Sequence, residues 1–549
     1  IFVYLTKQKK LLQKRLFANH DIRQILYASN NHLYASAIDP ELLYIDLHTG
    51  KADKYVSNPY QYGTLLNNKI HSLFEDFSGN LWVGHQGQGI SILNLNQKEF
   101  HTFRHDPFNK NSLTSNKVMC FDGTDKEIFI GLRTGGLNYM KKDFSESSTP
   151  EFHYVELKGN TNDYFSDGVW DIEKQNDNLF WVGSDVGLLM LYKSNSQWML
   201  KQYSDHDILN RAIRKIYVDD NNNLWCAPFD EGLIFIPNPE DNDNKVFYQY
   251  TSDITTDESI SDNTILTIDL DSQGRFWIGT GYGLNLLKAN YRNIDLSGKS
   301  KPELKFQRYI AVKKDSNYLN NNEINCVYEN YDGTIWIATQ GGGINILNTE
   351  KEKFSHITQD DGLPSNDVLG ILPDKMGNLW ISTTKGLVTY NQYQDEPKML
   401  NYKTPDGIQG DVFMVNSYYK AMDGELFFGG DNGFTRFYPK DIKPNTIKPK
   451  TVFTELRFGD VPVVIGDTIK KRQILQAHIN ESDAIVLPFK HKTFSIGVSP
   501  VHYQYPRGNK VMYKLEGYNQ KWITMPGYYD GIYYSNLPPG KYTLQVKSV

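Results

Sequence analysis

The sequence has few cysteines, no long apolar run and no large excess of charge of one sign. It has 3 cysteines in 549 residues, too few for a disulfide framework. No apolar run approaches the ~18 residues that a membrane-spanning helix requires. Its 58 Lys and Arg against 64 Asp and Glu give a net charge of −6, which is too balanced to indicate general binding of nucleic acid.

Aromatic residues and glycine are abundant instead. The chain has 36 Tyr, 28 Phe and 42 Gly. This composition favours many short strands joined by tight turns, and it argues against helical bundles and disorder. The chain starts at Ile1 with neither an initiator Met nor a secretion signal, so we expect it to be a piece of a longer protein.

One motif recurs along the chain: a strand, an Asp/Asn/Gly turn, a strand with an aromatic residue, a Gly-rich turn and another strand. The segment 271–279, Asp-Ser-Gln-Gly-Arg-Phe-Trp-Ile-Gly, is a clear copy. The aromatic anchors of nine copies lie 44 to 59 residues apart and are Tyr34, Trp82, Phe129, Trp181, Trp225, Trp277, Trp336, Trp380 and Phe427. A period of ~40–50 residues holding four strands is typical of a β-propeller blade. We therefore predict that the anchors are buried between neighbouring blades.

The residues around each anchor fit the same blade. The Asp that opens the turn can accept hydrogen bonds from backbone amides two residues on. A small residue two positions after the anchor allows close approach of the backbone. After every anchor except Tyr34, a Gly six or seven positions on supplies the positive φ of a tight turn. In the blade 69–103, the predicted strands are 70–75, 80–84, 89–93 and 99–103.

The repeat resembles the two-component regulator propeller repeat, and its nearest full copy is the segment 324–344, Ile-Asn-Cys-Val-Tyr-Glu-Asn-Tyr-Asp-Gly-Thr-Ile-Trp-Ile-Ala-Thr-Gln-Gly-Gly-Gly-Ile. The period then stops, and alternating apolar residues predict sandwich strands at 451–458, 484–487, 493–498, 511–515 and 541–547. The stretches 513–522 and 536–546 are similar to the tyrosine-rich immunoglobulin-like domain that follows such propellers in hybrid two-component sensors.

The repeats and this resemblance predict an all-β chain in three parts. Residues 1–110 are expected to be about two blades and a strand remnant from the end of another propeller. Residues 111–445 are expected to form a seven-bladed β-propeller, counted back from Phe427 to Phe129. Residues 446–549 are expected to be an Ig-like β-sandwich that is truncated. Pro444 and Pro449 predict a stiff linker before the sandwich.

The resemblance also implies a function. The chain would be the periplasmic, ligand-sensing part of a hybrid two-component sensor histidine kinase whose parent is anchored in the inner membrane. It would recognise an oligosaccharide, signal to carbohydrate-utilisation genes and form a homodimer through the C-terminal sandwich. This part of the protein would have no enzymatic activity, no cofactor and no direct contact with nucleic acid.

The sequence contains no convincing catalytic or metal-binding motif. His-Glu-x-x-His, Gly-x-Ser-x-Gly and P-loop motifs are absent, and the 13 His are scattered without the spacing of metal ligands. The run Glu240-Asp-Asn-Asp-Asn244 could hold calcium or be a solvated outer loop. Cys120, Cys226 and Cys326 fit buried small apolar positions. We therefore predict no catalytic residue and no metal site.

The loops between the second and third strands of each blade are the best candidates for ligand binding, because they share one face of a propeller. In the complete propeller these loops contain Arg133, Asp185, Phe229, Asp230, Glu231, Tyr282, Gln340, Lys385 and Asp431. Charged, amide and aromatic groups of this kind bind sugars by hydrogen bonds and ring stacking. Ordinary solvated turns, a propeller glycoside hydrolase or lyase, and a non-signalling interaction scaffold remain open alternatives. The negative charge of the propeller region makes a highly sulfated glycan less suitable.

Overall fold

The computed structural model describes residues 3–5, 10–12, 21–37, 41–48, 51–55, 57, 64–67, 69–96, 98–142, 150–157, 167–203, 206–240, 246–297, 299–312, 315, 317–394, 399–443, 447–469, 472–487, 493–503, 506–529 and 531–549. These residues form strands and a few single-turn 3-10 helices, which confirms the predicted all-β class. The helices are η2 (Tyr291–Asn293), η3 (Gln359–Asp361), η4 (Thr404–Asp406), η5 (Pro439–Asp441), η6 (Ile479–Glu481) and η7 (Pro506–Gly508). No helix in the described ranges is long and apolar enough to cross a membrane.

The chain divides into two compact units, Lys98–Lys443 and the combination of Ile1–Gln97 with Pro444–Val549. The first of these is built from antiparallel sheets whose strands follow one another in the sequence. The sheets are β11 (Val118–Gly123), β12 (Glu127–Leu132), β13 (Leu137–Lys141) and β14 (Phe152–Tyr154); β16 (Val169–Asn176), β17 (Leu179–Ser184), β18 (Gly187–Ser194) and β19 (Gln197–Gln202), with β15 (Glu156–Leu157) parallel to β19; β20 (Ile213–Val218), β21 (Leu224–Pro228), β22 (Leu233–Ile236) and β23 (Tyr248–Tyr250); β24 (Ile265–Leu270), β25 (Phe276–Thr280), β26 (Gly283–Leu287) and β27 (Phe306–Tyr309); β28 (Ile324–Glu329), β29 (Ile335–Thr339), β30 (Gly343–Asn348) and β31 (Lys353–Ile357); β32 (Val368–Pro373), β33 (Leu379–Thr383), β34 (Gly386–Tyr390) and β35 (Leu400–Tyr402); and β36 (Phe413–Lys420), β37 (Leu426–Gly430) and β38 (Gly433–Phe437) with β10 (His101–Phe103).

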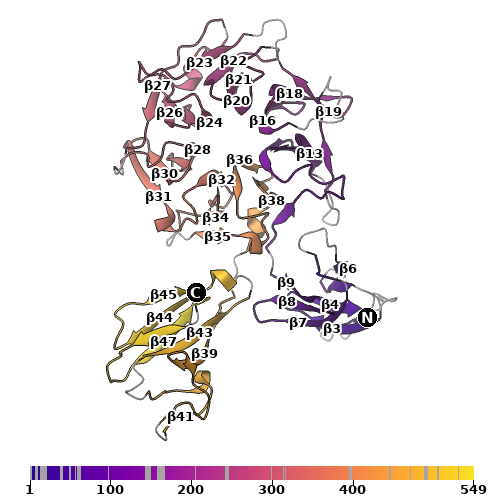
Figure 1. Cartoon of the computed structure of the whole chain (residues 1–549). Helices are drawn as coiled ribbons and strands as arrows, with labels where there is room; N and C mark the ends of the chain where they lie inside the picture. Colours follow the sequence, from indigo (N-terminus) through magenta and orange to yellow (C-terminus); the bar gives the residue numbers. More distant parts are fainter. Residues whose placement is uncertain are drawn as a thin grey trace. The chain divides into compact units, whose positions relative to one another are not determined.

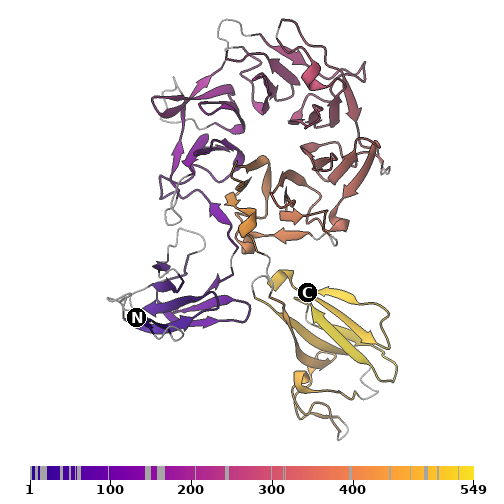
Figure 2. The same ribbon diagram turned by 180° about the vertical axis from the view of Figure 1, so that it is seen from behind.

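These sheets form a closed ring. Their first strands contact one another in the order β11, β16, β20, β24, β28, β32 and β36, and β36 contacts β11 again. Figure 1 shows the first strands nearest the centre of the ring, and Figure 2 shows the same ring from behind. Each sheet is thus a propeller blade whose innermost strand comes first in the sequence.

The outermost strand of the last sheet, β10, corrects the sequence analysis. We predicted 99–103 as the fourth strand of the blade that starts at residue 69, and a propeller that starts at 111. Instead β10 pairs antiparallel with β38, with Phe103 opposite Phe434, and the compact unit starts at Lys98. A strand at a blade boundary has the same spacing whichever sheet it joins, so the period could not distinguish the two. Pairing with β38 joins the two ends of the ring by hydrogen bonds and gives its last sheet a fourth, outermost strand.

The anchors are buried as predicted, except for Trp82, which is half-buried. Trp277 illustrates the arrangement, because its Nε1 donates a hydrogen bond to Asp271 Oδ2 at 2.8 Å. The other oxygen of Asp271 accepts from the backbone amides two and four residues on, which confirms the predicted turn. A Cβ added to Gly279 would lie 2.7 Å from a side-chain carbon of Ile324 in the next sheet, so this small residue sets the distance between blades.

The N-terminal part of the other unit holds a two-stranded, a four-stranded and a three-stranded sheet. Its strands are β1 (Val3–Leu5) with β2 (Lys10–Leu12); β3 (Ile22–Tyr27), β4 (His32–Ala37), β5 (Leu42–Asp46) and β6 (Ala52–Tyr55); and β7 (Ile70–Glu75), β8 (Asn80–His85) and β9 (Gly89–Asn94). Phe74, Trp82 and Ile92 lie directly opposite one another on one face of the sheet β7–β9, and Phe74 is 63% exposed. In the ring, the equivalent face packs against the next sheet, which is why Trp82 alone among the anchors is not fully buried.

The C-terminal part is a sandwich-like arrangement of two main sheets around a core that contains Leu456, Val511 and Ile532. The strands are β40 (Val461–Pro462), β39 (Lys450–Phe458), β43 (Thr493–Val501) and β46 (Ile532–Ser535); β45 (Ile523–Pro526), β44 (Lys510–Glu516) and β47 (Thr543–Ser548); and the pair β41 (Thr468–Ile469) and β42 (Arg472–Gln473). The predicted strand 484–487 is wrong, because these residues form no ladder. The strands β45 and β46 were not predicted.

Candidate functional site

Six of the seven innermost strands of the ring, all except β36, begin with a β-bulge. In β16, for example, Val169 pairs with Ser184 and Asp171 pairs with Gly183. Trp170, which lies between them, is therefore opposite no residue of β17. The same irregularity leaves one unpaired residue in five further sheets. The bulge residues are Met119, Trp170, Arg214, Leu266, Asn325 and Leu369. A bulge changes the direction in which a side chain points. The six bulges lie at the same end of the ring as the loops between second and third strands.

Two bulge residues join three predicted loop residues in what we call the Arg–Trp cluster: Arg133, Trp170, Asp185, Arg214 and Phe229. Arg133 Nη1 forms an ion pair with Asp185 Oδ2 at 2.8 Å, and Trp170 Nε1 donates to Asp185 Oδ1 at 2.7 Å. The guanidinium carbons of Arg133 and Arg214 lie 4.5 and 3.3 Å from the centre of the Trp170 ring. Arg214 also lies 5.0 Å from the ring of Phe229. Three neighbouring sheets thus bring two cations, one anion and two aromatic rings together.

The charges in the Arg–Trp cluster are not balanced. The carboxylate of Asp185 is used by Arg133 and Trp170, whereas Arg214 has no ion-pair partner among the described residues. The Nε atom of Arg214 is buried and has no hydrogen-bond partner among the described residues. Burial lowers the pKa of the Arg214 guanidinium below its usual range; Asp185 offsets this effect in part, and Arg133 adds to it. The cluster therefore carries one positive charge that the described residues do not neutralise.

The remaining predicted site residues lie in the same set of loops but do not join the cluster. Glu231 forms an ion pair with Arg211, and Asp230 Oδ1 is 3.4 Å from Thr264 Oγ1. Gln340 Oε1 accepts from Asn325 Nδ2 at 3.3 Å. Tyr282, Lys385 and Asp431 lie in the corresponding turns of three other sheets, and no contact joins them to another predicted site residue among the described residues.

One residue reaches across this region of the ring. Asn416 lies in the irregular part of β36 with φ +61°, and its Nδ2 is 3.5 Å from the carbonyl oxygen of Leu266 in β24. The strands β36 and β24 belong to sheets that are not neighbours in the ring. This contact therefore links two sheets across the ring, whereas the Arg–Trp cluster lies on three other sheets.

The innermost strands also carry a charged network inside the ring. Lys215 Nζ lies 2.9 Å from Asp171 Oδ2, which also accepts from a backbone amide of the next sheet at 2.7 Å. Burial raises the pKa of Asp122 and of Asp269 to about 7. Burial, and then the charge of Asp122, raise the pKa of Glu173. Carboxyl groups of this kind occur at catalytic centres, but here Asp171 bonds from one sheet to the next, so the network acts first as a link between blades.

The described cysteines are buried, and the described acidic residues do not gather into a group of metal ligands. Cys120, Cys226 and Cys326 are buried and free, as predicted, and burial raises the pKa of Cys326 to about 11. No group of three or more His, Cys, Asp or Glu in the described ranges could hold a metal ion. Glu240 accepts from Gln175 Nε2 at 3.2 Å, and residues 241–244 of the possible calcium loop lie outside the described residues.

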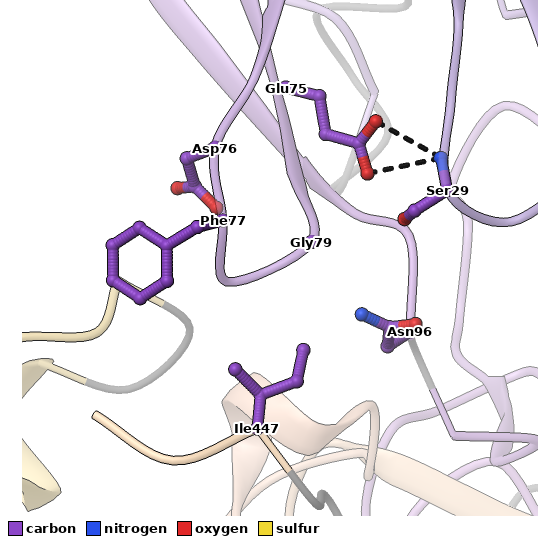
Figure 3. A pocket seen from close by; sticks show the side chains of 7 residues that line it. All are labelled: Ser29, Glu75, Asp76, Phe77, Gly79, Asn96 and Ile447. Carbon is purple, nitrogen blue, oxygen red and sulfur yellow. Dashed lines mark hydrogen bonds between the residues drawn. The ribbon is translucent and has the colours of Figure 1, made fainter. Parts of the chain in front are cut away.

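A separate cavity of about 620 Å³ lies in the other unit, at the turn between β7 and β8 (Figure 3). Its lining residues are Ser29, Glu75, Asp76, Phe77, Gly79, Asn96 and Ile447. The Glu75 carboxylate accepts from the backbone amide of Ser29 at 3.0 and 3.1 Å, and Asp76 is fully used within its own turn. Both carboxylates of this cavity therefore already serve the local fold.

Comparison with known families identifies both kinds of domain. The two-component regulator propeller family matches residues 64–87, 259–282, 318–341 and 362–385, and the Y_Y_Y domain family matches residues 502–549. The chain contains two-component regulator propeller repeats followed by a Y_Y_Y domain. The resemblance stated from the sequence is thereby confirmed, and neither family is a catalytic domain.

Two individual proteins are similar over most of the chain. Histidine kinase P4 from Formosa agariphila is 26% identical over 489 residues, which are 87% of this chain and 33% of the relative. The chain thus spans a third of that curated relative. The crystal structure of an extracellular domain assigned to a hybrid two-component system of B. thetaiotaomicron has a TM-score of 0.72 and 21% identity, and covers 100% of this chain and 67% of the other. The second likeness shows that the fold is shared.

The sequence analysis missed Trp170 and Arg214, the two residues at the middle of the Arg–Trp cluster. It considered only the loops between second and third strands, whereas both residues are the second residue of an innermost strand. The sequence did contain a signal at this position. Three of the other bulge residues are aliphatic or Met side chains, whereas Trp follows Val169 and Arg follows Ile213. Without the bulges, that position cannot be assigned to the ring face.

Proposed function

We propose that this chain is the periplasmic, ligand-sensing part of a hybrid two-component sensor histidine kinase, and that it binds an oligosaccharide on the ring face that carries the Arg–Trp cluster. Two-component regulator propeller repeats next to a Y_Y_Y domain, together with similarity to a histidine kinase, support a sensor role. The parent protein would be anchored in the inner membrane and would control carbohydrate-utilisation genes.

The main support for this binding site is that bulge residues and loop residues contact one another at one end of the ring. Phe229 is 53% exposed although it is a large apolar side chain, and it lies beside the guanidinium of Arg214. Sugars bind proteins by stacking their apolar face on an aromatic ring while nearby polar groups hydrogen-bond their hydroxyls. The cluster offers both kinds of group.

The sandwich is proposed to pass the signal on as a homodimer. Its surface exposes Tyr528, Tyr529 and Tyr533, and the rings of Tyr528 and Tyr529 stack at 5.5 Å. Exposed tyrosines of this kind are enriched at protein interfaces. Ligand binding would change the placement of rigid bodies rather than their chemistry. Part of the predicted stiff linker before the sandwich, residues 444–446, lies outside the described residues.

A panel of oligosaccharides tests the proposal. Each is incubated with the protein, and both the melting temperature and any cleavage of the sugar are measured. We expect at least one oligosaccharide to raise the melting temperature without being cleaved, and Phe229→Ala to reduce that shift. Cleavage would favour a glycoside hydrolase or lyase instead, and the absence of any shift would favour an interaction scaffold.

A further inference from the structure

The position of Arg214 limits the kind of sugar that can bind beside it. Its guanidinium stacks on Trp170 at 3.3 Å and lies 5.0 Å from the ring of Phe229, so two aromatic rings replace water around the charge. The carboxylate of Asp185 offsets the charge of Arg214 only in part, and it already accepts from Arg133 and from Trp170. A partly buried cation without a counter-ion is unfavourable, and an anion supplied by a ligand would relieve that cost.

The geometry favours one planar anionic group. A guanidinium presents parallel N–H donors that match the two oxygens of a carboxylate, and such pairs are among the strongest hydrogen bonds in proteins. The nearby exposed ring of Phe229 could stack on the sugar that bears the carboxylate. A densely charged chain would fit less well, because the same set of loops carries the carboxylates of Asp230 and Asp431.

We propose that the Arg–Trp cluster is a subsite for a single uronic acid residue of the sensed oligosaccharide, with Arg214 as the donor to its carboxylate. This inference rests on the proposed function, because it specifies the class of sugar for the same site. Trp170 would hold the guanidinium in place, since Arg133 and Arg214 both stack on its ring. Asp185 would fix Trp170 and Arg133 and would not touch the ligand.

The first measurement compares matched sugars on the wild-type chain. Calorimetric titration uses trisaccharides of galacturonate, glucuronate, mannuronate and guluronate, each beside its carboxyl-reduced neutral form, and a sulfated trisaccharide as a third arm. At least one uronate should bind about 10–100-fold more tightly than its reduced form, which is the ratio that a charged hydrogen bond supplies. Tighter binding of the neutral forms, or of the sulfated arm, would overturn the proposal.

The second measurement uses variants with the uronate that binds best. Arg214→Gln should weaken uronate binding about 10–100-fold and leave binding of the reduced sugar unchanged. Arg214→Lys keeps the charge but loses the planar donors. The affinity of this variant for the uronate should therefore lie between that of the wild type and that of Arg214→Gln. Arg211→Gln is the matched control, because Arg211 lies three residues away and already has Glu231 as its partner. Equal uronate affinity in Arg214→Gln and the wild type would contradict the proposal, even if the Lys variant does not fold.

The two proposals fail in distinguishable ways. If a neutral oligosaccharide binds and Phe229→Ala weakens it while uronates do not bind, the sensor function stands and the uronate subsite is wrong. If none of the uronate, neutral or sulfated sugars binds the wild-type chain, both proposals are contradicted. If Arg214→Gln and Arg211→Gln weaken uronate binding equally, the effect is one of overall charge and the subsite is again wrong.

Discussion

Closure of the ring by β10 leads to a quantitative prediction for Phe103. Its ring lies 5.1 Å from that of Phe434 in β38 and 5.8 Å from that of Phe152 in β14, so it joins the last and first sheets. Replacing a fully buried Phe by Ala costs about 3–5 kcal/mol, and Phe103 is half-buried. We therefore expect Phe103→Ala to lower the free energy of unfolding of the ring by roughly 2–3 kcal/mol.

Hydrogen–deuterium exchange read by mass spectrometry locates this loss in the chain. In Phe103→Ala, the amides of β38 should exchange faster, because their outer hydrogen-bonding partner is loosened, while those of β9 should not change. Phe74→Ala is the matched control: Phe74 is 63% exposed, so this variant should change stability by less than about 0.5 kcal/mol. Faster exchange in β9 with β38 unchanged would mean that residues 101–103 belong to the N-terminal sheet and that the ring closes in another way.

Three further predictions concern stability. Trp277→Ala should cost about 3–5 kcal/mol in urea unfolding and Tyr282→Ala less than about 1 kcal/mol, because the first side chain is fully buried and the second is 55% exposed; equal costs would mean that the blade register is wrong. The pKa of Asp122 is about 7 in the folded protein, against an ordinary value of 3.8, so protonation of this carboxyl stabilises the fold at low pH. That contribution is lost as the pH rises through 7. The melting temperature should therefore fall from pH 5.5 to 8, and Asp122→Asn should reduce that fall. Tyr503 packs edge-on against Trp82 at 5.6 Å, so a double-mutant cycle with alanine at both positions should give a coupling of about 0.5–1.5 kcal/mol, and a coupling near zero would mean that this contact does not form.

The blade itself was predictable because it is a local unit. The Asp of each turn, the buried aromatic anchor and the Gly before the third strand recur at fixed spacing, and each has a local physical role. The structure bears out these roles: Asp374, for example, accepts from backbone amides and from Trp380, and Gly386 has φ +127°. Local geometry of this kind depends on residues a few positions apart, and a single sequence contains that information.

The partner of a strand at a blade boundary was not predictable in the same way. Residues 101–103 follow β9 at the spacing of an ordinary fourth strand, yet they pair with β38, more than 300 residues later. The choice depends on the free edge that the last sheet of a closed ring leaves, and that edge exists only when all the sheets are in place. The period alone therefore placed the start of the ring about ten residues too late.

The residues of the proposed ligand-binding face also depend partly on local sequence and partly on tertiary contacts. The turns that hold Arg133, Asp185 and Phe229 follow from the repeat, so these residues could be named from the sequence. That Trp170 and Arg214 join them depends on a bulge in each of their innermost strands and on the packing of three neighbouring sheets. A bulge changes which way one side chain points without changing the hydrophobic pattern around it. The sequence by itself therefore determined the blades and their turns, whereas the closing strand and the unbalanced charge of Arg214 were decided only by contacts between sheets that are distant in the chain.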